Sequence, residues 1–293
     1  MHTSYDTAQW LKGLPDNLLI GNINLPGTHN AAAIHPTRRT LHACQHHSIT
    51  QQLYGGIRLL DVRLKVHRRQ GGSAGGQPLP GGLLAFHTCH GRIGRNTFQS
   101  LSSLLDECRR FLADNHSEFV VLLLKIDDWS NVEPYAGEAL AALAALLRHY
   151  PTLSEATLPR LGAVRGKLIL YNRINDDPVL GTPVRWERDT AGAAACPSRD
   201  RTYAVWVQDR YNDFSAHPRR AKLRRIVAAL DKKVAENVVL NFASGTWFGC
   251  FGIYVMEQLS LLLRERGRAS LGWTLFDYPF WTDVVVTVIN SNF

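Results

Sequence analysis

Eight short apolar runs recur along the chain, and several of them are continuous rather than alternating. Strands that are buried on both faces of a parallel sheet have this pattern. The runs lie at residues 18–25, 56–64, 83–87, 119–126, 167–172, 203–209, 237–242 and 271–277. We therefore predict eight β-strands, most of them inside the protein.

Between these runs, apolar residues recur at three- and four-residue spacing, as on one face of a helix. Such stretches occupy residues 97–115, 135–150, 219–237 and 254–266. Alternation of helices with eight strands predicts the α/β class and a single irregular (β/α)8 barrel that spans residues 1–293 as one domain. The links after the second, fifth and seventh strands look less helical, and the glycine-rich stretch 71–82 reads as a hairpin-like connector.

Composition supports a globular protein. The chain has 293 residues, of which 45% are hydrophobic and 20% charged, so it has enough apolar side chains for a large core. No apolar run approaches the ~18 residues of a membrane span. Five cysteines occur without a CxxC spacing, which argues against a disulfide framework and a structural zinc site.

A formal net charge of +8 favours anionic partners such as phospholipid surfaces or nucleic acid, although a basic surface with no specific partner has the same charge. No DNA- or RNA-binding motif supports the nucleic-acid alternative. No signal peptide is visible at the start of the sequence, so we expect either a cytosolic protein or one whose leader has been removed.

Polar residues follow the predicted strands at the end where a barrel enzyme carries its chemistry. Seven of the eight strand ends carry an ionisable group. In chain order, the polar residues at these ends are His29 and Asn30; Asp61 and Arg63; His87 and His90; Lys125, Asp127 and Asp128; Arg173; Asp209 and Tyr211; Asn241; and Asp277 and Tyr278.

Two imidazoles and a permanent guanidinium are suited to phosphodiester transfer, because the imidazoles serve as base and acid while the guanidinium neutralises phosphoryl charge. Taken singly, each group also has a structural interpretation, such as a packed histidine or an aspartate that caps a helix. A divalent metal ion is the main enzymatic alternative, but Arg63 and Lys125 bring positive charge into the same mouth. Among the histidines outside the strand ends, we expect no catalytic role for His35, His42, His46, His47, His67 and His116.

The segments LPGTHN, LLDVR, CHG and GWTLFDY, in this order, resemble the X-domain of phosphatidylinositol-specific phospholipase C, and in particular the compact bacterial enzymes. The resemblance implies that His29 is the general base, that Asp277 holds it, that Arg63 contacts the phosphate and that His90 is the general acid. His87 has no counterpart role. Arg63 stands where calcium-dependent relatives have a carboxylate, which implies catalysis without a metal or other cofactor.

The same resemblance implies that Lys125, Arg173, Asp209 and Tyr211 bind the inositol ring. Asn30 departs from the bacterial pattern, in which an aspartate assists the general acid, and nearby Asp61 is the candidate to compensate for it.

The loop after the seventh strand carries Trp247 and Phe248, which resemble a membrane-inserting rim. They could equally be buried core residues. Phe280 and Trp281 are weaker candidates for the same rim.

The favoured function is a metal-independent lyase that cleaves phosphatidylinositol to diacylglycerol and inositol 1,2-cyclic phosphate. Its partner would be phosphatidylinositol in a membrane surface, bound transiently by a monomer that a bacterium secretes. The alternatives are a metal-dependent glycerophosphodiesterase-like barrel and a non-catalytic lipid-binding X-domain. Against the metal-dependent barrel, this sequence has no acidic cluster at the second predicted strand. A non-catalytic X-domain would be expected to lose His29 or His90, and both are present here.

Overall fold

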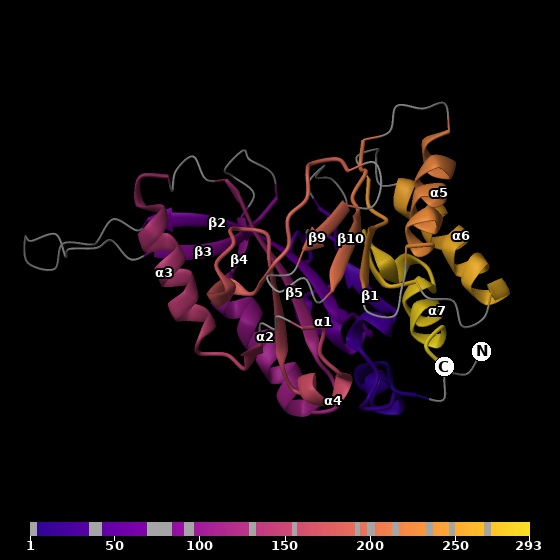
Figure 1. The fold of residues 1–293 in the computed structure, drawn as a ribbon, viewed down its shortest axis with the longest axis horizontal. Coiled ribbons are helices and arrows are strands. Elements are labelled where there is room, and N and C mark those ends of the chain that lie inside the picture. The colour runs from indigo at the N-terminus through magenta and orange to yellow at the C-terminus, as the bar shows by residue number, and fades with distance from the viewer. Residues whose placement is uncertain are drawn as a thin grey trace, which may run out of the picture.

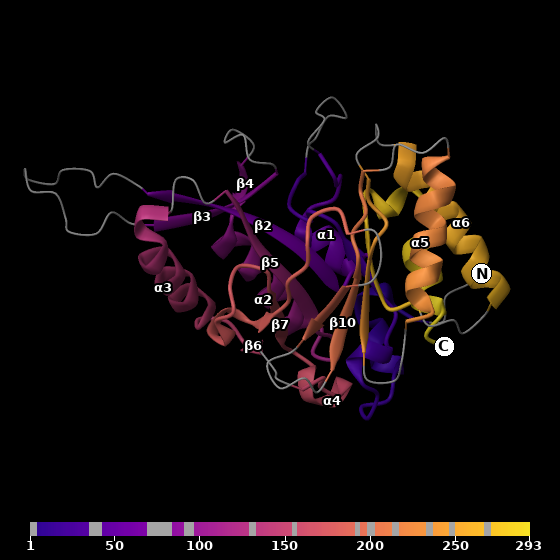
Figure 2. The ribbon, with the colours of Figure 1, turned by 45° about the horizontal axis from the view of Figure 1, so that its top comes forward.

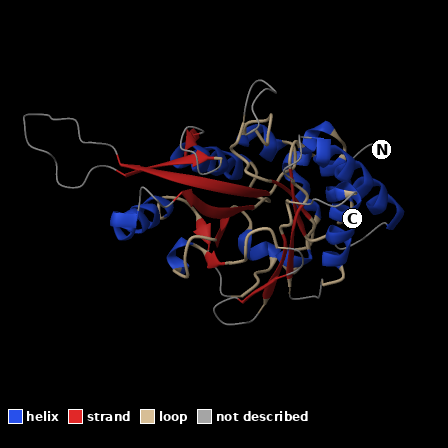
Figure 3. Cartoon of the chain, turned by 90° about the horizontal axis from the view of Figure 1, so that it is seen from above, coloured by secondary structure: helices blue, strands red, loops and turns tan. Residues whose placement is uncertain are grey.

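The computed structural model describes residues 5–34, 43–68, 84–90, 97–128, 133–153, 157–190, 194–197, 203–212, 217–232, 237–245, 250–266 and 271–293. Its centre is a curled, largely parallel sheet with helices outside it, as the view from above shows (Figure 3). The expected α/β class and irregular barrel are confirmed.

Seven parallel strands form the curved wall in the order β7-β5-β2-β1-β12-β11-β10. Of these, Figure 1 labels β5, β2, β1 and β10. Most of their side chains are fully buried because one face lines the interior and the other packs on helices. Their bounds are β1 Leu25–Thr28, β2 Leu59–Arg68, β5 Val120–Asp128, β7 Leu168–Asn172, β10 Ala204–Gln208, β11 Val238–Phe242 and β12 Trp273–Phe276.

The irregularity lies between β7 and β10. Two short strands, β6 (Thr152–Leu153) and β8 (Thr182–Pro183), pair with β7, while β9 (Ala194–Pro197) pairs antiparallel with β10. In the described part of the chain no ladder joins these two groups of strands. The hydroxyls of Tyr171 and Tyr203 meet there at 3.2 Å and bridge the break.

The prediction that residues 83–87 form a barrel strand is wrong. This run is β3 (Leu84–Cys89), which pairs antiparallel with the far half of β2 and with β4 (Thr97–Ser100). β2 is ten residues long and runs past the barrel, so β3 covers this extension as the second arm of a hairpin (Figure 2). The connector 71–82 lies outside the described residues.

The four predicted helices are present, with the first shortened because residues 97–100 form β4. Ser100 begins that helix by accepting a hydrogen bond from the backbone N–H of Ser103. None of the helices in the described ranges is long and apolar enough to cross a bilayer. The helices are α1 Ile49–Tyr54, α2 Leu101–Asp114, α3 Ala136–Leu147, α4 Leu161–Val164, α5 Pro218–Leu230, α6 Cys250–Arg266 and α7 Val284–Asn290, with 3₁₀ turns at Thr7–Gly13, Ile20–Asn22, Glu133–Tyr135, Pro178–Leu180 and Pro279–Trp281.

The predicted first strand, 18–25, is also misplaced. Its middle forms the 3₁₀ turn Ile20–Asn22, and β1 begins only at Leu25. Ile20 and Ile23 are apolar because they enter the core from this turn, and not because they belong to a strand.

A fully buried ion pair closes the amino-terminal end of the barrel. Arg58, just before β2, donates to Glu118 at 2.8 Å, and its other N–H groups donate to backbone carbonyls, among them those of Leu53 and Ala8. Its guanidinium also lies 4.6 Å from the centroid of the Phe111 ring. The chemistry of a barrel sits at the opposite end, so this pair serves stability.

Candidate active site

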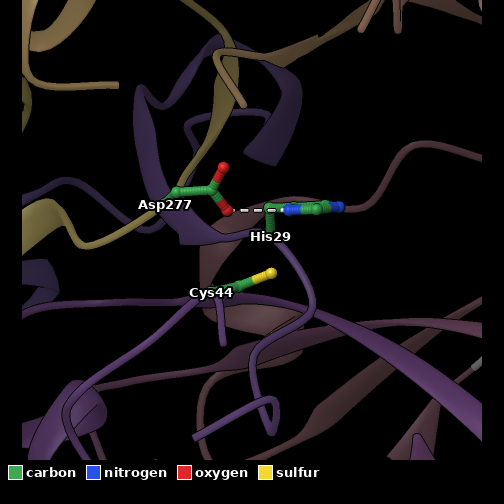
Figure 4. Close-up of side chains that lie close together, drawn as sticks. All are labelled: His29, Cys44 and Asp277. Atoms are coloured by element: carbon green, nitrogen blue, oxygen red, sulfur yellow. Dashed lines mark hydrogen bonds and ion pairs between the residues drawn. The ribbon is translucent and has the colours of Figure 1, made fainter. Parts of the chain in front are cut away.

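His29 and Asp277 meet because β1 and β12 lie side by side in register. Thr28 is opposite Phe276, and each functional residue comes directly after its strand. The His29 Nδ1 lies 2.8 Å from Asp277 Oδ1, as the dashed line in Figure 4 marks. The two side chains are 14% and 18% exposed, which leaves them reachable at the barrel mouth.

The other ring nitrogen of His29 defines its tautomer. Arg63 Nη2 lies 2.7 Å from His29 Nε2, and a guanidinium only donates hydrogen bonds. Nε2 therefore accepts, so the proton of the neutral ring is on Nδ1, where it is donated to Asp277. This arrangement leaves the lone pair of a general base on Nε2.

Two carboxylates hold Arg63 in place. Its Nε donates to Asp61 Oδ2 at 3.3 Å, and its Nη1 lies 3.9 Å from Asp127 Oδ2. Burial favours the neutral form of each of these groups, but their mutual attraction outweighs it, so the pKa of Arg63 is raised and those of Asp61 and Asp127 are lowered. Lys125, opposite Arg63 on β5, adds a contact of 2.5 Å to Asp127.

His90 reaches the same mouth from the hairpin. β3 runs antiparallel to β2, with Thr88 opposite Leu64, so its carboxyl end returns toward Arg63. The rings of His90 and His29 lie edge to face, with their centroids 6.4 Å apart and their planes at 87°. Both histidines singled out in the sequence therefore lie together, although His90 does not follow a barrel strand.

Cys44 is a member of this cluster that sequence reasoning missed. Its Sγ lies 3.6 Å from His90 Nδ1, and its backbone N–H donates to the carbonyl of Ala33 at 2.9 Å. Burial first, and then the charge of Asp277, raises the pKa of the Cys44 thiol well above its usual range. Cys44 lies outside the described helices and strands, so neither periodicity nor Cys spacing in the sequence indicates that it reaches the mouth.

Asn30 adopts a left-handed backbone conformation with φ of 41°. Its backbone N–H donates to Asp61 Oδ2 at 3.0 Å, so this residue helps to hold the carboxylate that positions Arg63. Its side-chain amide is buried, and neither amide atom has a hydrogen-bond partner among the residues that the structure describes.

The four residues expected to bind the inositol are linked partly through Trp186, which the sequence did not indicate. The Arg173 guanidinium lies 3.5 Å from the centroid of the Trp186 ring, whose Nε1 donates to Asp209 Oδ2 at 2.8 Å. Burial lowers the pKa of Arg173, against the pull of Asp61 and Asp209. The Tyr211 backbone is fixed by its N–H, which donates to Asp189 at 2.8 Å.

Two of the remaining histidines pack on aromatic residues after β12. His46 contacts Tyr278 and Trp281, and His47 contacts Phe280. Tyr278 and Trp281 stack with their centroids 4.4 Å apart, and Trp281 is 37% exposed. His67 and His87 pair on the hairpin and His116 lies on the surface, whereas His35, His42, Trp247 and Phe248 lie outside the described residues.

Comparison with known proteins gives the site its context. The family model described as PI-PLC X matches residues 19–160. A 1-phosphatidylinositol phosphodiesterase of Staphylococcus aureus (strain Newman) is 23% identical over 319 residues, covering 99% of this chain and 95% of that protein. That of Listeria monocytogenes serovar 1/2a is 27% identical over 309 residues, covering 99% of this chain and 87% of that protein.

Solved structures show the same fold. The phosphatidylinositol-specific phospholipase C of S. aureus superposes with a TM-score of 0.79 at 20% identity, covering 98% of this chain and 97% of that one. The enzyme of L. monocytogenes superposes with a TM-score of 0.69 at 21% identity, covering 99% of this chain and 100% of that one. Residues 19–160 therefore match the PI-PLC X family model, and the chain as a whole has the fold of the bacterial phosphatidylinositol-specific phospholipases C.

Proposed function

We propose that this protein is a phosphatidylinositol-specific phospholipase C that works without a metal ion. The observation that carries the proposal is the arrangement around His29, which places a carboxylate on Nδ1, a guanidinium on Nε2 and the imidazole of His90 opposite. The curated relatives are named for action on phosphatidylinositol, and they cover nearly the whole chain.

The reaction follows from the roles that these groups suit. His29 Nε2 takes the proton of the inositol 2-hydroxyl, whose oxygen attacks the adjacent phosphorus, while Asp277 stabilises the resulting imidazolium. Before this proton transfer, Arg63 turns from His29 to the non-bridging phosphate oxygens of the bound lipid, which uncovers the Nε2 lone pair. His90 protonates the departing diacylglycerol oxygen, which leaves inositol 1,2-cyclic phosphate, and water opens this ring when the two histidines exchange roles.

Arg63 is the reason to expect no metal. Calcium prefers six to eight oxygen ligands. The two carboxylates nearest to Arg63, those of Asp61 and Asp127, are engaged by Arg63 and Lys125. A fixed guanidinium thus occupies the place where a hard cation would neutralise the phosphate.

The inositol ring would lie among Lys125, Arg173, Asp209 and Tyr211, which supply donors and acceptors for its hydroxyls. Access to the lipid would come from aromatic side chains at the mouth, with Trp247 and Phe248 as the sequence candidates. We further propose that residues 1–293 act as one domain, as a secreted bacterial monomer that meets its lipid transiently at the membrane.

Phosphorus NMR of phosphatidylinositol vesicles in excess EDTA tests the proposal. The expected product is a cyclic inositol phosphate, formed by the native protein and by the surface control His116→Ala but not by His29→Ala. Turnover that needs added calcium would refute metal independence. No turnover in either condition would leave a lipid-binding role or another phosphodiester.

A further inference from the structure

Three potential metal ligands converge at the barrel mouth. One ligand atom each of His29, Cys44 and Asp277 lies within 4.8 Å of the other two. Figure 4 shows the Cys44 sulfur turned into the space beside the His29 ring and the Asp277 carboxylate. These three side chains come from three separate segments, so the fold and not local sequence brings them together.

His90 supplies a fourth ligand. Its Nδ1 lies 3.6 Å from Cys44 Sγ. A tetrahedral zinc ion with typical bonds to sulfur and nitrogen separates these two atoms by about 3.6 Å, so this pair is already spaced for a shared ion. Among His29, Cys44 and Asp277, no pair of ligand atoms would have to approach by more than roughly 1.5 Å.

We propose that Cys44, His90, Asp277 and His29 form a binding site for a soft divalent cation such as Zn²⁺, and that occupation of this site inhibits the enzyme. The set of one thiolate, one carboxylate and two imidazoles is one that zinc accepts. The two anionic ligands balance the charge of the ion. Arg63 stays neutralised by its own partners, Asp61 and Asp127.

Binding exchanges protons for metal bonds. The Cys44 thiol loses its proton to water as the metal–sulfur bond forms, and His90 gives the metal the lone pair of Nδ1. At His29 the metal replaces the proton on Nδ1, next to Asp277; that proton moves to Nε2, and Arg63 turns away from it. His29 then has no free lone pair for the inositol hydroxyl, and His90 has no proton for the leaving group. The inhibition rests on the proposed function, but the binding does not.

The ligands also predict selectivity. Calcium and magnesium prefer oxygen donors, and this cluster offers one carboxylate among sulfur and nitrogen, so these ions are not expected to bind. Zinc, cadmium and cobalt(II) are expected to bind, because they accept the Cys44 thiolate as a ligand. Binding of zinc at this site is therefore a separate matter from the argument that Arg63 makes calcium unnecessary for catalysis.

Cobalt(II) titration of the metal-free, untagged protein tests the site without any substrate. The expected result is a near-ultraviolet thiolate-to-cobalt charge-transfer band together with the intense visible absorption of tetrahedral cobalt. Zinc should displace both, and calcium should not. Absence of the charge-transfer band in the native protein overturns the proposal, whatever any variant does.

Matched variants assign the sulfur. Cys44→Ala and Cys44→Ser should lose the band, whereas Cys108→Ala, which removes a thiol on the buried face of α2, should keep it. Two different substitutions of Cys44 are used so that the test still works if one of the variants folds poorly. A band that survives both Cys44 substitutions refutes the assignment.

An activity assay then separates this inference from the proposed function. Zinc should slow cleavage of phosphatidylinositol at least ~10-fold, EDTA should restore it, and Cys44→Ser should need at least ~10-fold more zinc for the same loss. Undiminished turnover in the zinc-loaded protein overturns the inhibitory role. No turnover in EDTA refutes the proposed function, while the cobalt spectrum still decides whether the metal site exists.

Discussion

Replacing Asp277 by asparagine or alanine tests how the candidate base is held. The Asp277 carboxylate accepts the Nδ1 proton of His29 at 2.8 Å, with both side chains largely buried. A hydrogen bond to a charged group contributes roughly 1.5–3 kcal/mol. If this stabilisation is felt in the transition state, where the ring becomes an imidazolium, its loss slows the reaction by roughly 10- to 150-fold.

Asparagine adds a second effect. When its amide NH₂ faces Nδ1, the ring proton must move to Nε2, where it points at the Arg63 guanidinium 2.7 Å away. The base then has no lone pair for the hydroxyl, and a tautomer error of this kind costs up to ~10⁴ in turnover. We therefore expect Asp277→Ala to lose about 10- to 150-fold in kcat/KM and Asp277→Asn to be no faster.

The assay is initial-rate release of inositol cyclic phosphate from mixed micelles, with circular dichroism to check folding. Asp283→Asn is the matched control, because Asp283 forms an exposed ion pair with Arg264 on the surface. Either Asp277 variant within about threefold of the native rate would show that the carboxylate does not support the base.

Three further predictions concern the charges that surround the site and the core. Arg63→Lys should lower kcat/KM at least ~10²-fold, because an ammonium loses the forked contacts of the guanidinium to two carboxylates and the phosphate. Added calcium should not restore the activity of this variant. A decrease of less than tenfold would contradict the role of Arg63 in binding the phosphate. Glu118→Ala should cost roughly 3–5 kcal/mol in urea unfolding, since it leaves Arg58 charged and unpaired in the core; a loss below about 1 kcal/mol would refute this. Lys222 is a buried residue of α5, and burial lowers its pKa from 10.5 to about 8. Its positive charge therefore destabilises the fold fully below pH 8, and this destabilisation disappears as the pH rises to 10.5. Lys222→Met should therefore gain roughly 3 kcal/mol over the native protein at pH 7 and lose most of that gain by pH 10.5, and a pH-independent difference would contradict it.

Much of the site could be predicted because strand ends in a parallel barrel share one edge. His29, Arg63, Lys125, Arg173 and Asp277 all follow from finding apolar runs and reading the polar residues at their ends. The register of neighbouring strands then decides which of them touch, as it does for His29 and Asp277.

The errors have a common physical origin. An apolar run of five residues shows that a segment is buried, but it does not show in which direction or with which neighbour the segment pairs. A strand is present close to the predicted run 83–87, yet this strand, Leu84–Cys89, pairs antiparallel with β2 outside the barrel. Cys44 and Trp186 lie outside regular elements, where no periodicity exists, so only the folded chain shows that they contact His90 and Arg173.

The charge balance around Arg63 explains how a cation can be kept ready for phosphate in a partly buried site. A lone guanidinium there would be costly, and two full ion pairs would leave it no attraction for a substrate. Arg63 instead has one carboxylate contact at 3.3 Å and another at 3.9 Å, and its Nη2 rests on a neutral imidazole. The contact with His29 is the one that an incoming substrate can replace at least cost, because no ion pair is broken. In the proposed mechanism the same movement uncovers the His29 lone pair, so that binding of the phosphate and exposure of the proposed base become one event.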